Sequence, residues 1–145
     1  MKKICIIGGA GFIGHNLAVQ LRIIGHEVTC VDNLMVNNLI SVIGNSDGLK
    51  FKALNKKIIE SRLDLLEKND IELKIADARD YHLVSRLITD LKPDIVIHLA
   101  AVSHANRSNK DPFNTFDHSF RTLENVLDAS RDSIERLIYF SSSMV

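Results

Sequence analysis

A glycine-rich turn near the N-terminus most constrains how this chain can fold. It reads Gly-Gly-Ala-Gly-Phe-Ile-Gly from Gly8 to Gly14, directly after an apolar run at residues 4–7. The next segment, residues 12–24, has apolar residues at helical spacing. A buried strand that leads into a helix leaves free backbone amides and the positive end of the helix dipole at the turn. We therefore predict a site for a pyrophosphate at this turn.

Three glycines of the turn have distinct predicted tasks. Gly8 allows the tight turn, because glycine tolerates backbone angles that other residues avoid. Gly11 has no side chain, so a pyrophosphate can approach the backbone, and Gly14 lets the helix pack close to the strand. The alternative is an unrelated strand–helix–strand unit in which the glycines are only structural.

An acidic residue at the end of the second predicted strand supports the binding interpretation. That strand covers residues 27–31 and follows Gly25, which is typical of a helix end. Asp32 stands 18 residues after Gly14, where a carboxylate can accept hydrogen bonds from the adenosine ribose and repel a 2′-phosphate. Because no Lys or Arg occurs between Asp32 and Lys50, we predict NAD rather than NADP as the ligand.

Strand and helix patterns alternate over the rest of the chain. Strands are predicted at residues 71–76, 94–99 and 134–140, and helices at 39–43, 56–68, 80–91 and 111–130. Asp80 and Asp111 are predicted to cap the last two helices at their N-termini, the latter with Pro112 in the first turn. This alternation predicts an α/β protein with a doubly wound parallel sheet, a Rossmann fold of five strands in the order 3-2-1-4-5 with helices on both faces. Ligands should bind outside the carboxyl ends of the strands.

Composition narrows the class of protein further. The chain has 145 residues, 46% of them hydrophobic and 25% charged, and a formal net charge of zero. The length and the hydrophobic content suit a single domain. A net charge of zero argues against electrostatic binding to nucleic acid or to a membrane surface. Cys5 and Cys30 fall in predicted strands, where we expect small core residues with reduced thiols. No Cys/His spacing fits a metal site. With no recognisable signal peptide or membrane-spanning run, we expect a cytoplasmic protein.

The spacing of the glycines points to a known family. The run from Gly8 to Gly14, together with Val31-Asp32-Asn33-Leu34, resembles the extended short-chain dehydrogenase/reductase family, whose members include nucleotide-sugar epimerases and dehydratases such as UDP-glucose 4-epimerase. His15 and Asn16 depart from the residues usual in that family, and we expect both to face solvent.

The resemblance implies a set of NAD-binding residues. Asp77, in Ala76-Asp77-Ala78, would contact the adenine amino group, and the alanines of His98-Leu99-Ala100-Ala101 would line the cofactor ribose and pyrophosphate. We expect His98 itself to be an interior histidine with satisfied hydrogen bonds rather than a base. The full set of implied cofactor-binding residues is Gly8, Gly11, Phe12, Ile13, Gly14, Asp32, Asn33, Leu34, Asp77, Ala78, Leu99, Ala100 and Ala101.

The C-terminal third matches the family less completely. Ser119 stands where the family has an asparagine, and Thr122 where it has a glycine. Ser142 takes the place of the catalytic Ser/Thr, with Ser141 and Ser143 as alternatives, and the acids that sugar dehydratases carry next to it are absent. The family's Tyr-x-x-x-Lys base is also absent. We therefore interpret residues 1–145 as an NAD-binding domain that stops before the Tyr-x-x-x-Lys helix and the substrate domain.

By resemblance, the function expected is the NAD-binding part of a nucleotide-sugar epimerase, in which a hydride is removed and returned at a sugar carbon through a 4-keto intermediate. Another NAD-dependent sugar-nucleotide enzyme, such as a decarboxylase or reductase, is one alternative. A non-catalytic NAD(H) sensor or scaffold is another, and further sequence with Tyr-x-x-x-Lys would discriminate against it. The 145-residue chain alone is expected to be inactive.

The predicted helix at residues 111–130 carries an aromatic stripe, formed by Phe116, Phe120, Leu123 and Leu127. The resemblance implies a homodimer through this helix. The alternative is that the stripe packs on the sheet. Beyond a nucleotide-sugar substrate and a second copy of the chain, we expect neither nucleic acid nor membrane as a partner.

Overall fold

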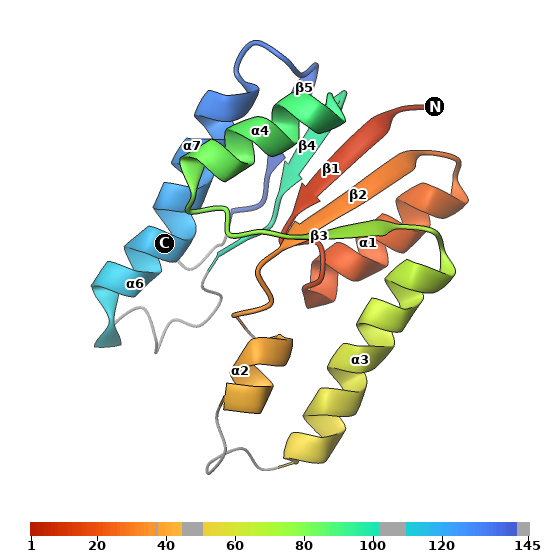
Figure 1. The fold of residues 1–145 in the computed structure, drawn as a ribbon, viewed down its shortest axis with the longest axis vertical. Coiled ribbons are helices and arrows are strands. Elements are labelled where there is room, and N and C mark those ends of the chain that lie inside the picture. The colour runs from red at the N-terminus through yellow and green to blue at the C-terminus, as the bar shows by residue number, and fades with distance from the viewer. Residues whose placement is uncertain (37, 45–50, 102–109, 142–145) are drawn as a thin grey trace.

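A computed structural model of the chain describes residues 1–36, 38–44, 51–101 and 110–141. Five strands form one parallel sheet in the order β3-β2-β1-β4-β5 (Figure 1). The strands are β1 (Lys3–Ile7), β2 (Glu27–Asp32), β3 (Glu72–Ile75), β4 (Ile95–His98) and β5 (Arg136–Tyr139). The predicted fold class and strand order are confirmed.

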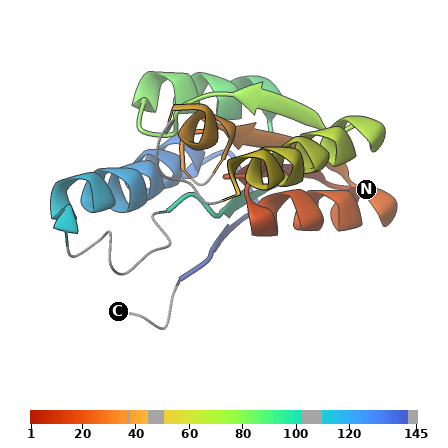
Figure 2. The same ribbon diagram turned by 90° about the horizontal axis from the view of Figure 1, so that it is seen from below.

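Helices cover both faces of the sheet. They are α1 (Phe12–Ile23), α2 (Leu39–Gly44), α3 (Lys52–Lys68), α4 (Tyr81–Leu91), α6 (Pro112–Phe116), the π-helical turn η1 (Asp117–Arg121) and α7 (Thr122–Ser130). In Figure 2 the strands lie between α4 on one side and α1 on the other. Each side has its own apolar core, with α1 and α3 packed on one face and α4 and α7 on the other.

The two cores explain why the central strands read as continuous apolar runs. Ile6 of β1 lies opposite Cys30 of β2 and Ile97 of β4, and all three side chains belong to the core under α1 and α3. Cys5 belongs to the core under α4 and α7. Both cysteines are free and buried, as predicted, and burial raises the pKa of each thiol to about 12.

The buried face of α1 includes small residues and a histidine. Its buried residues are Gly14, His15 and Ala18, whereas Ile13 is 55% exposed. The expectation that His15 faces solvent is therefore wrong, while Asn16 is exposed as expected. Small side chains bring the helix close to the sheet, and the His15 ring is accommodated because its Nδ1 lies 2.8 Å from the Gly11 carbonyl oxygen.

The predicted caps at Asp80 and Asp111 and the stop at Gly25 agree with the structure, whereas α3 begins at Lys52, four residues before the predicted start at Lys56. Asp80 caps α4 by accepting a hydrogen bond from the Leu83 amide at 3.1 Å, and Asp111 caps α6 by accepting from the Asn114 amide at 3.1 Å. Gly25 adopts a φ of +93° just after α1, as a helix C-terminus requires.

The long helix predicted over residues 111–130 is interrupted. The π-helical turn η1 separates α6 from α7, a change that apolar periodicity could not reveal. The Thr122 hydroxyl lies 3.0 Å from the His118 carbonyl oxygen and 3.1 Å from that of Ser119, so it donates into this turn. Such turns inside α-helices are frequent at functional sites.

The aromatic stripe is exposed. Phe116 is 58% exposed and Phe120 60%, and their rings stack with centroids 4.9 Å apart. Val126 and Ala129, on the other side of α7, pack into the core. The alternative that the stripe packs on the sheet is therefore wrong.

Candidate functional site

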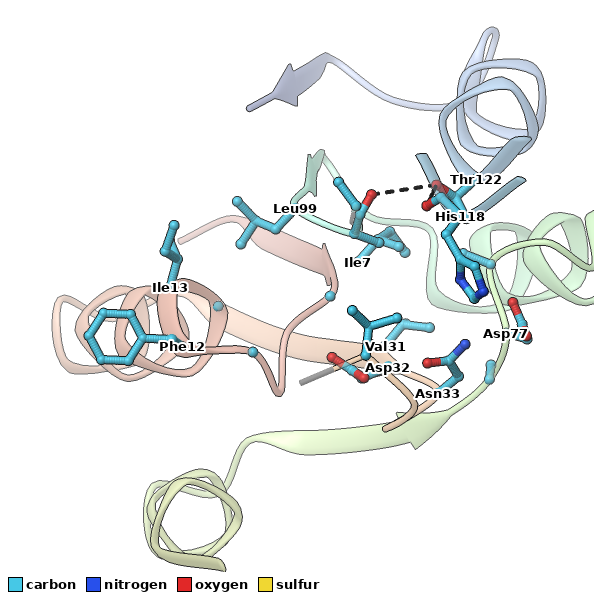
Figure 3. A pocket seen from close by; sticks show the side chains of 18 of the residues that line it. Ile7, Phe12, Ile13, Val31, Asp32, Asn33, Asp77, Leu99, His118 and Thr122 are labelled. Carbon is cyan, nitrogen blue, oxygen red and sulfur yellow. Dashed lines mark hydrogen bonds between the residues drawn. The ribbon is translucent and has the colours of Figure 1, made fainter. Parts of the chain in front are cut away.

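One cavity of about 390 Å³ lies at the carboxyl ends of the parallel strands (Figure 3). This is the volume range of small-molecule sites. Its wall is formed by residues that end or directly follow β1, β2, β3 and β4, together with residues of α1, α3, η1 and α7. The lining residues are Ile7, Gly8, Gly11, Phe12, Ile13, Gly14, Val31, Asp32, Asn33, Val36, Arg62, Ala76, Asp77, Ala78, Leu99, Ala100, Ala101, His118 and Thr122.

The glycine turn is tightly packed between β1 and α1. Gly8 has a φ of +84°, and its amide donates to the Val31 carbonyl oxygen at 2.7 Å. A Cβ at Gly8 would lie 2.9 Å from the Ala100 amide nitrogen, and one at Gly14 would lie 2.7 Å from the Gly9 Cα. The structural roles predicted for Gly8 and Gly14 are thus confirmed.

Gly9 also requires glycine, which the sequence analysis missed. A Cβ at this position would lie 2.6 Å from the Cys30 sulfur. Only the pairing of β1 with β2 creates this contact, because Cys30 sits opposite Ile6 in the neighbouring strand.

Asp32 is held by the backbone it faces. One carboxylate oxygen accepts from the Ala10 amide at 3.1 Å and the other from the Leu34 amide at 2.8 Å. Burial raises the pKa of Asp32, and the two backbone hydrogen bonds oppose that shift. The acid is thereby oriented at the cavity wall beside the glycine turn. Leu34 itself is buried and does not line the cavity, so its observed contribution is the amide that holds Asp32.

A second carboxylate, Asp77, lines the cavity just after β3. Arg79 binds both of its oxygens, with Nη2 at 2.6 Å from Oδ2 and Nε at 3.0 Å from Oδ1. Hydrogen bonds from Arg79, with a smaller contribution from Asn33, lower the pKa of Asp77 to about 2. Asp77 therefore presents an ionised acceptor at neutral pH. In Figure 3 the side chains of Asn33 and His118 point towards it.

The end of β4 closes the cavity opposite Asp32. Leu99, Ala100 and Ala101 line it, and the Leu99 amide donates to the Ile7 carbonyl oxygen at 2.8 Å. His98 is buried as expected, but neither ring nitrogen has a hydrogen-bond partner among the described residues. The expectation of a satisfied histidine is wrong at this point. Burial lowers the pKa of His98 to about 4, so the ring is neutral at pH 7.

Two cavity residues come from parts of the chain that the sequence analysis did not connect with the site. Arg62 of α3 reaches the wall with its guanidinium carbon 5.7 Å from the centre of the Phe12 ring. His118 of η1 lies beside Asp77 and Arg79. Local sequence carries no signal for either position. Arg62 brings a basic side chain to the cavity that Asp32 also lines, from beyond the stretch between Asp32 and Lys50.

Thr122 lines the cavity in the place where the family has a glycine. Its hydroxyl lies 3.5 Å from the Ala100 carbonyl oxygen, so α7 meets the end of β4 at this residue. Ser142, the predicted catalytic residue, lies outside the described residues. In the described ranges no helix is long and apolar enough to cross a membrane, and no cluster of three or more acidic, His or Cys side chains could hold a metal ion.

The fold and the cavity define a class of protein. A doubly wound sheet with a glycine turn at a helix N-terminus and an acid after β2 is a dinucleotide-binding Rossmann domain. The sequence matches the NAD dependent epimerase/dehydratase family over residues 4–145, and the chain belongs to that family.

Individual relatives agree with this assignment. The chain is 33% identical over 144 residues to Protein CapI of Staphylococcus aureus and 29% identical over 140 residues to UDP-glucose 4-epimerase of Lacticaseibacillus casei. These matches cover 99% and 97% of the chain but only 38% and 35% of the relatives' lengths. The chain thus spans less than half the length of these relatives.

Solved structures give the same result. The structure superimposes with a TM-score of 0.76 on UDP-glucose-4-epimerase from Stenotrophomonas maltophila, a complex with NAD and formylated UDP-arabinopyranose. That match has 27% identity and covers 100% of this chain and 38% of the other. The UDP-Glc/GlcNAc 4-epimerase from Campylobacter jejuni gives 0.75 at 26% identity, with 99% and 38% covered. The cofactor expectation, NAD, is confirmed for the family.

Proposed function

We propose that this chain is the NAD-binding part of a nucleotide-sugar epimerase. The observation that carries the proposal is that the predicted cofactor-binding residues, apart from Leu34, line one cavity at the strand ends. The match to epimerases over the whole chain supports the reaction class. In such an enzyme NAD supplies the hydride acceptor, and the residues of this chain bind and orient it.

The proposed binding mode follows from the groups on the cavity wall. The pyrophosphate lies against the free amides at the start of α1, where Gly11 leaves the backbone open. The Asp32 carboxylate accepts from the adenosine ribose hydroxyls, and the Asp77 carboxylate accepts from the adenine amino group. Leu99, Ala100 and Ala101 leave room for the rest of the cofactor.

Catalysis is proposed to require more than this chain contains. Neither Tyr81 nor Tyr139 has a lysine four residues later, so no tyrosine–lysine pair of the family type is present in the sequence. We propose that the 145 residues bind NAD without turnover of a UDP-sugar. The role of Ser142, a hydrogen bond to the reacting hydroxyl or keto oxygen, stays a prediction for an enzyme that also has the tyrosine and lysine. A cytoplasmic location fits two buried free thiols and stays part of the proposal.

Calorimetric titration with NAD⁺ tests the binding proposal. The wild-type chain should bind NAD⁺, and Gly11→Val should abolish binding, because the new side chain occupies the pyrophosphate's path while circular dichroism stays unchanged. Gly44→Val is the matched control, since a Cβ at Gly44 meets nothing within 4 Å. Failure of the wild type to bind NAD⁺ would refute the proposed function, and normal binding by Gly11→Val would make the glycine turn purely structural.

The proposed partner is a second copy of the chain, bound through the aromatic stripe. Phe120, Leu123 and Leu127 line a shallow apolar hollow on η1 and α7, with Glu124, Asp128 and Arg131 around it. A two-fold axis places the same patch of the two copies face to face. The acids beside the hollow of one copy can then pair with the arginine beside the hollow of the other. Exposed aromatic residues of this extent are typical of an interaction surface.

A further inference from the structure

One arginine joins the loop after β3 to the π-helical turn. The Arg79 guanidinium binds Asp77 through Nε and Nη2, and its Nη1 lies 3.1 Å from Asp117 Oδ2 and 3.2 Å from His118 Nε2. Asp77 and His118 both line the cavity. A single side chain thus ties together two walls that are about 40 positions apart in the sequence.

The ion pair between Arg79 and Asp77 is less exposed and more firmly held than a typical surface ion pair. The Arg79 side chain is 27% exposed and that of Asp77 30%. The Arg79 amide also donates to Asp77 Oδ1 at 2.9 Å. The buried Asn125 of α7 donates to the carbonyl oxygens of Ala78 and Arg79 at 3.0 Å and 2.8 Å, which fixes the backbone of the loop.

The same contact sets the protonation of His118. A guanidinium has only donors, so the His118 Nε2 beside it must accept. A neutral ring that accepts at Nε2 carries its proton on Nδ1. Burial and the Arg79 charge both lower the pKa of His118, which keeps the ring neutral. The cavity wall at this end therefore combines a fixed carboxylate with a neutral imidazole.

We infer that Arg79 is the positioning residue of the adenine end of the site. It fixes the Asp77 carboxylate as an acceptor for the exocyclic amino group and ties that acceptor to the turn formed by Asp117–Arg121. The inference rests on the proposed function, because Arg79 would act on the ligand only through Asp77, whose proposed partner is the bound adenine. A carboxylate that cannot rotate away rejects a base that presents an oxygen in place of the amino group.

Nicotinamide hypoxanthine dinucleotide is the matched probe, since it differs from NAD⁺ in the base alone: a carbonyl oxygen replaces that amino group, and ring nitrogen N1 carries a proton. Affinities of the full 145-residue chain for both dinucleotides are measured by calorimetry. Arg79→Met removes the guanidinium, and Arg79→Lys keeps the charge without the two-pronged geometry. Arg121→Met is the control: Arg121 also approaches Asp117, at 3.9 Å, but is exposed and does not line the cavity.

The ratio of the two affinities is the readout. Wild type and Arg121→Met should prefer NAD⁺ by about tenfold or more, as expected for one charged hydrogen bond. Arg79→Met should bring the ratio close to one, and Arg79→Lys should restore it only in part. An Arg79→Met ratio equal to that of wild type, with both affinities lowered alike, would mean a structural role only and would overturn the inference.

Two further outcomes separate this inference from the proposed function. A wild type that binds neither dinucleotide refutes the function itself. A wild type that binds both equally refutes the acceptor role of Asp77 and the inference with it. If both Arg79 variants fail to fold, Asp117→Asn decides, because it removes the negative charge with which the turn holds Arg79. It should lower the ratio about threefold, and an unchanged ratio overturns the inference.

Discussion

The Asp32 carboxylate is held by the backbone of the glycine turn. Its carboxylate accepts from the amides of Ala10 and Leu34, and the Ala10 carbonyl oxygen in turn accepts from the buried Asn38 side chain at 3.1 Å. Removing the carboxylate therefore leaves two amides without their partner and, in the proposed binding mode, the ribose without its acceptor. Without the Asp32 carboxylate, the positive charge of Arg62 would remain at the wall of the same cavity.

From this arrangement we expect tighter binding of NAD⁺ than of NADP⁺. Asp32→Ala should lose about 1–3 kcal/mol of NAD⁺ binding free energy, the usual cost of buried groups left unpaired. It should also narrow the difference from NADP⁺, because the repulsive carboxylate is gone while Arg62 remains. Calorimetric titration with both dinucleotides measures this.

The double variant Asp32→Ala, Arg62→Met isolates the arginine. It should bind NADP⁺ more weakly than Asp32→Ala does. Equal NADP⁺ affinities in the single and double variants would rule out a contact between Arg62 and the 2′-phosphate, and a wild type that prefers NADP⁺ would contradict the role of Asp32.

Asp77 makes stability depend on pH in the acid range. Its pKa is about 2 in the folded chain, mainly because Arg79 binds the carboxylate, and lies near 3.8 ordinarily. A carboxylate with a lowered folded pKa stabilises the fold above its unfolded pKa and loses that contribution as the pH falls through its folded pKa. The free energy of unfolding of wild type should therefore exceed that of Asp77→Asn at pH 5, and the difference should shrink between about pH 4 and pH 2.

Urea unfolding at a series of pH values measures that difference. A gap between wild type and Asp77→Asn that stays constant from pH 5 to pH 2 would show that the Arg79 pair does not act through ionisation of Asp77.

At the scale of the element, α4 begins at a side-chain cap. Asp80 accepts from the Leu83 amide, and α4 buries Val84 and Ile88 in the core shared with α7. Asp80→Ala should lower the free energy of unfolding by about 1 kcal/mol, because the helix start loses its acceptor. Chemical denaturation monitored by circular dichroism measures this loss.

Asp90 supplies the control for the cap. It is exposed near the C-terminus of the same helix, where an acid opposes the helix dipole. Asp90→Ala should therefore not destabilise the chain. Equal losses in the two variants would mean that the Asp80 cap contributes nothing specific.

The α6–η1–α7 segment packs on the sheet with one face and exposes aromatic rings on another. Thr122, Asn125 and Val126 are buried towards the sheet and the loop after β3, whereas Phe116 and Phe120 face outward. The π-helical turn lies where His118 reaches the cavity, so the segment connects the cavity wall beside Asp77 with the aromatic stripe.

At the scale of the whole molecule, we expect the chain to self-associate through the aromatic stripe. Sedimentation velocity at tens of micromolar should show a dimer for wild type and a monomer for the Phe116→Glu, Phe120→Glu variant. Burial of the stacked rings between two copies provides the driving force, and a charge on each ring position opposes it.

Leu54→Glu, Ile58→Glu is the matched control, with the same charge and the same spacing on α3. Leu54 is 53% exposed and Ile58 42%. The control should remain dimeric. A monomeric wild type would refute self-association, and a dimer that persists in the phenylalanine variant would place the contact elsewhere.

Much of the fold could be predicted because its signals are local. The glycine turn, the acid after β2, the caps at Asp80 and Asp111 and the apolar strand runs depend on near neighbours in the chain, and rules of parallel topology then give the strand order. The same locality explains why the predicted cofactor residues next to strand ends lie together. A parallel sheet brings the carboxyl ends of its strands to one edge, however the helices are rotated on its faces.

The remaining features depended on how helices pack, which near neighbours do not encode. The rotation of α1 on the sheet buries His15, and the approach of α3 to α1 brings Arg62 over Phe12. The π-helical turn carries His118 to Arg79 across about 40 positions of sequence. The sequence by itself determined the sheet, the turn and the dinucleotide class. Only the tertiary structure decided which charged side chains meet at the cavity, because helix rotation and distance follow from the packing of the complete core.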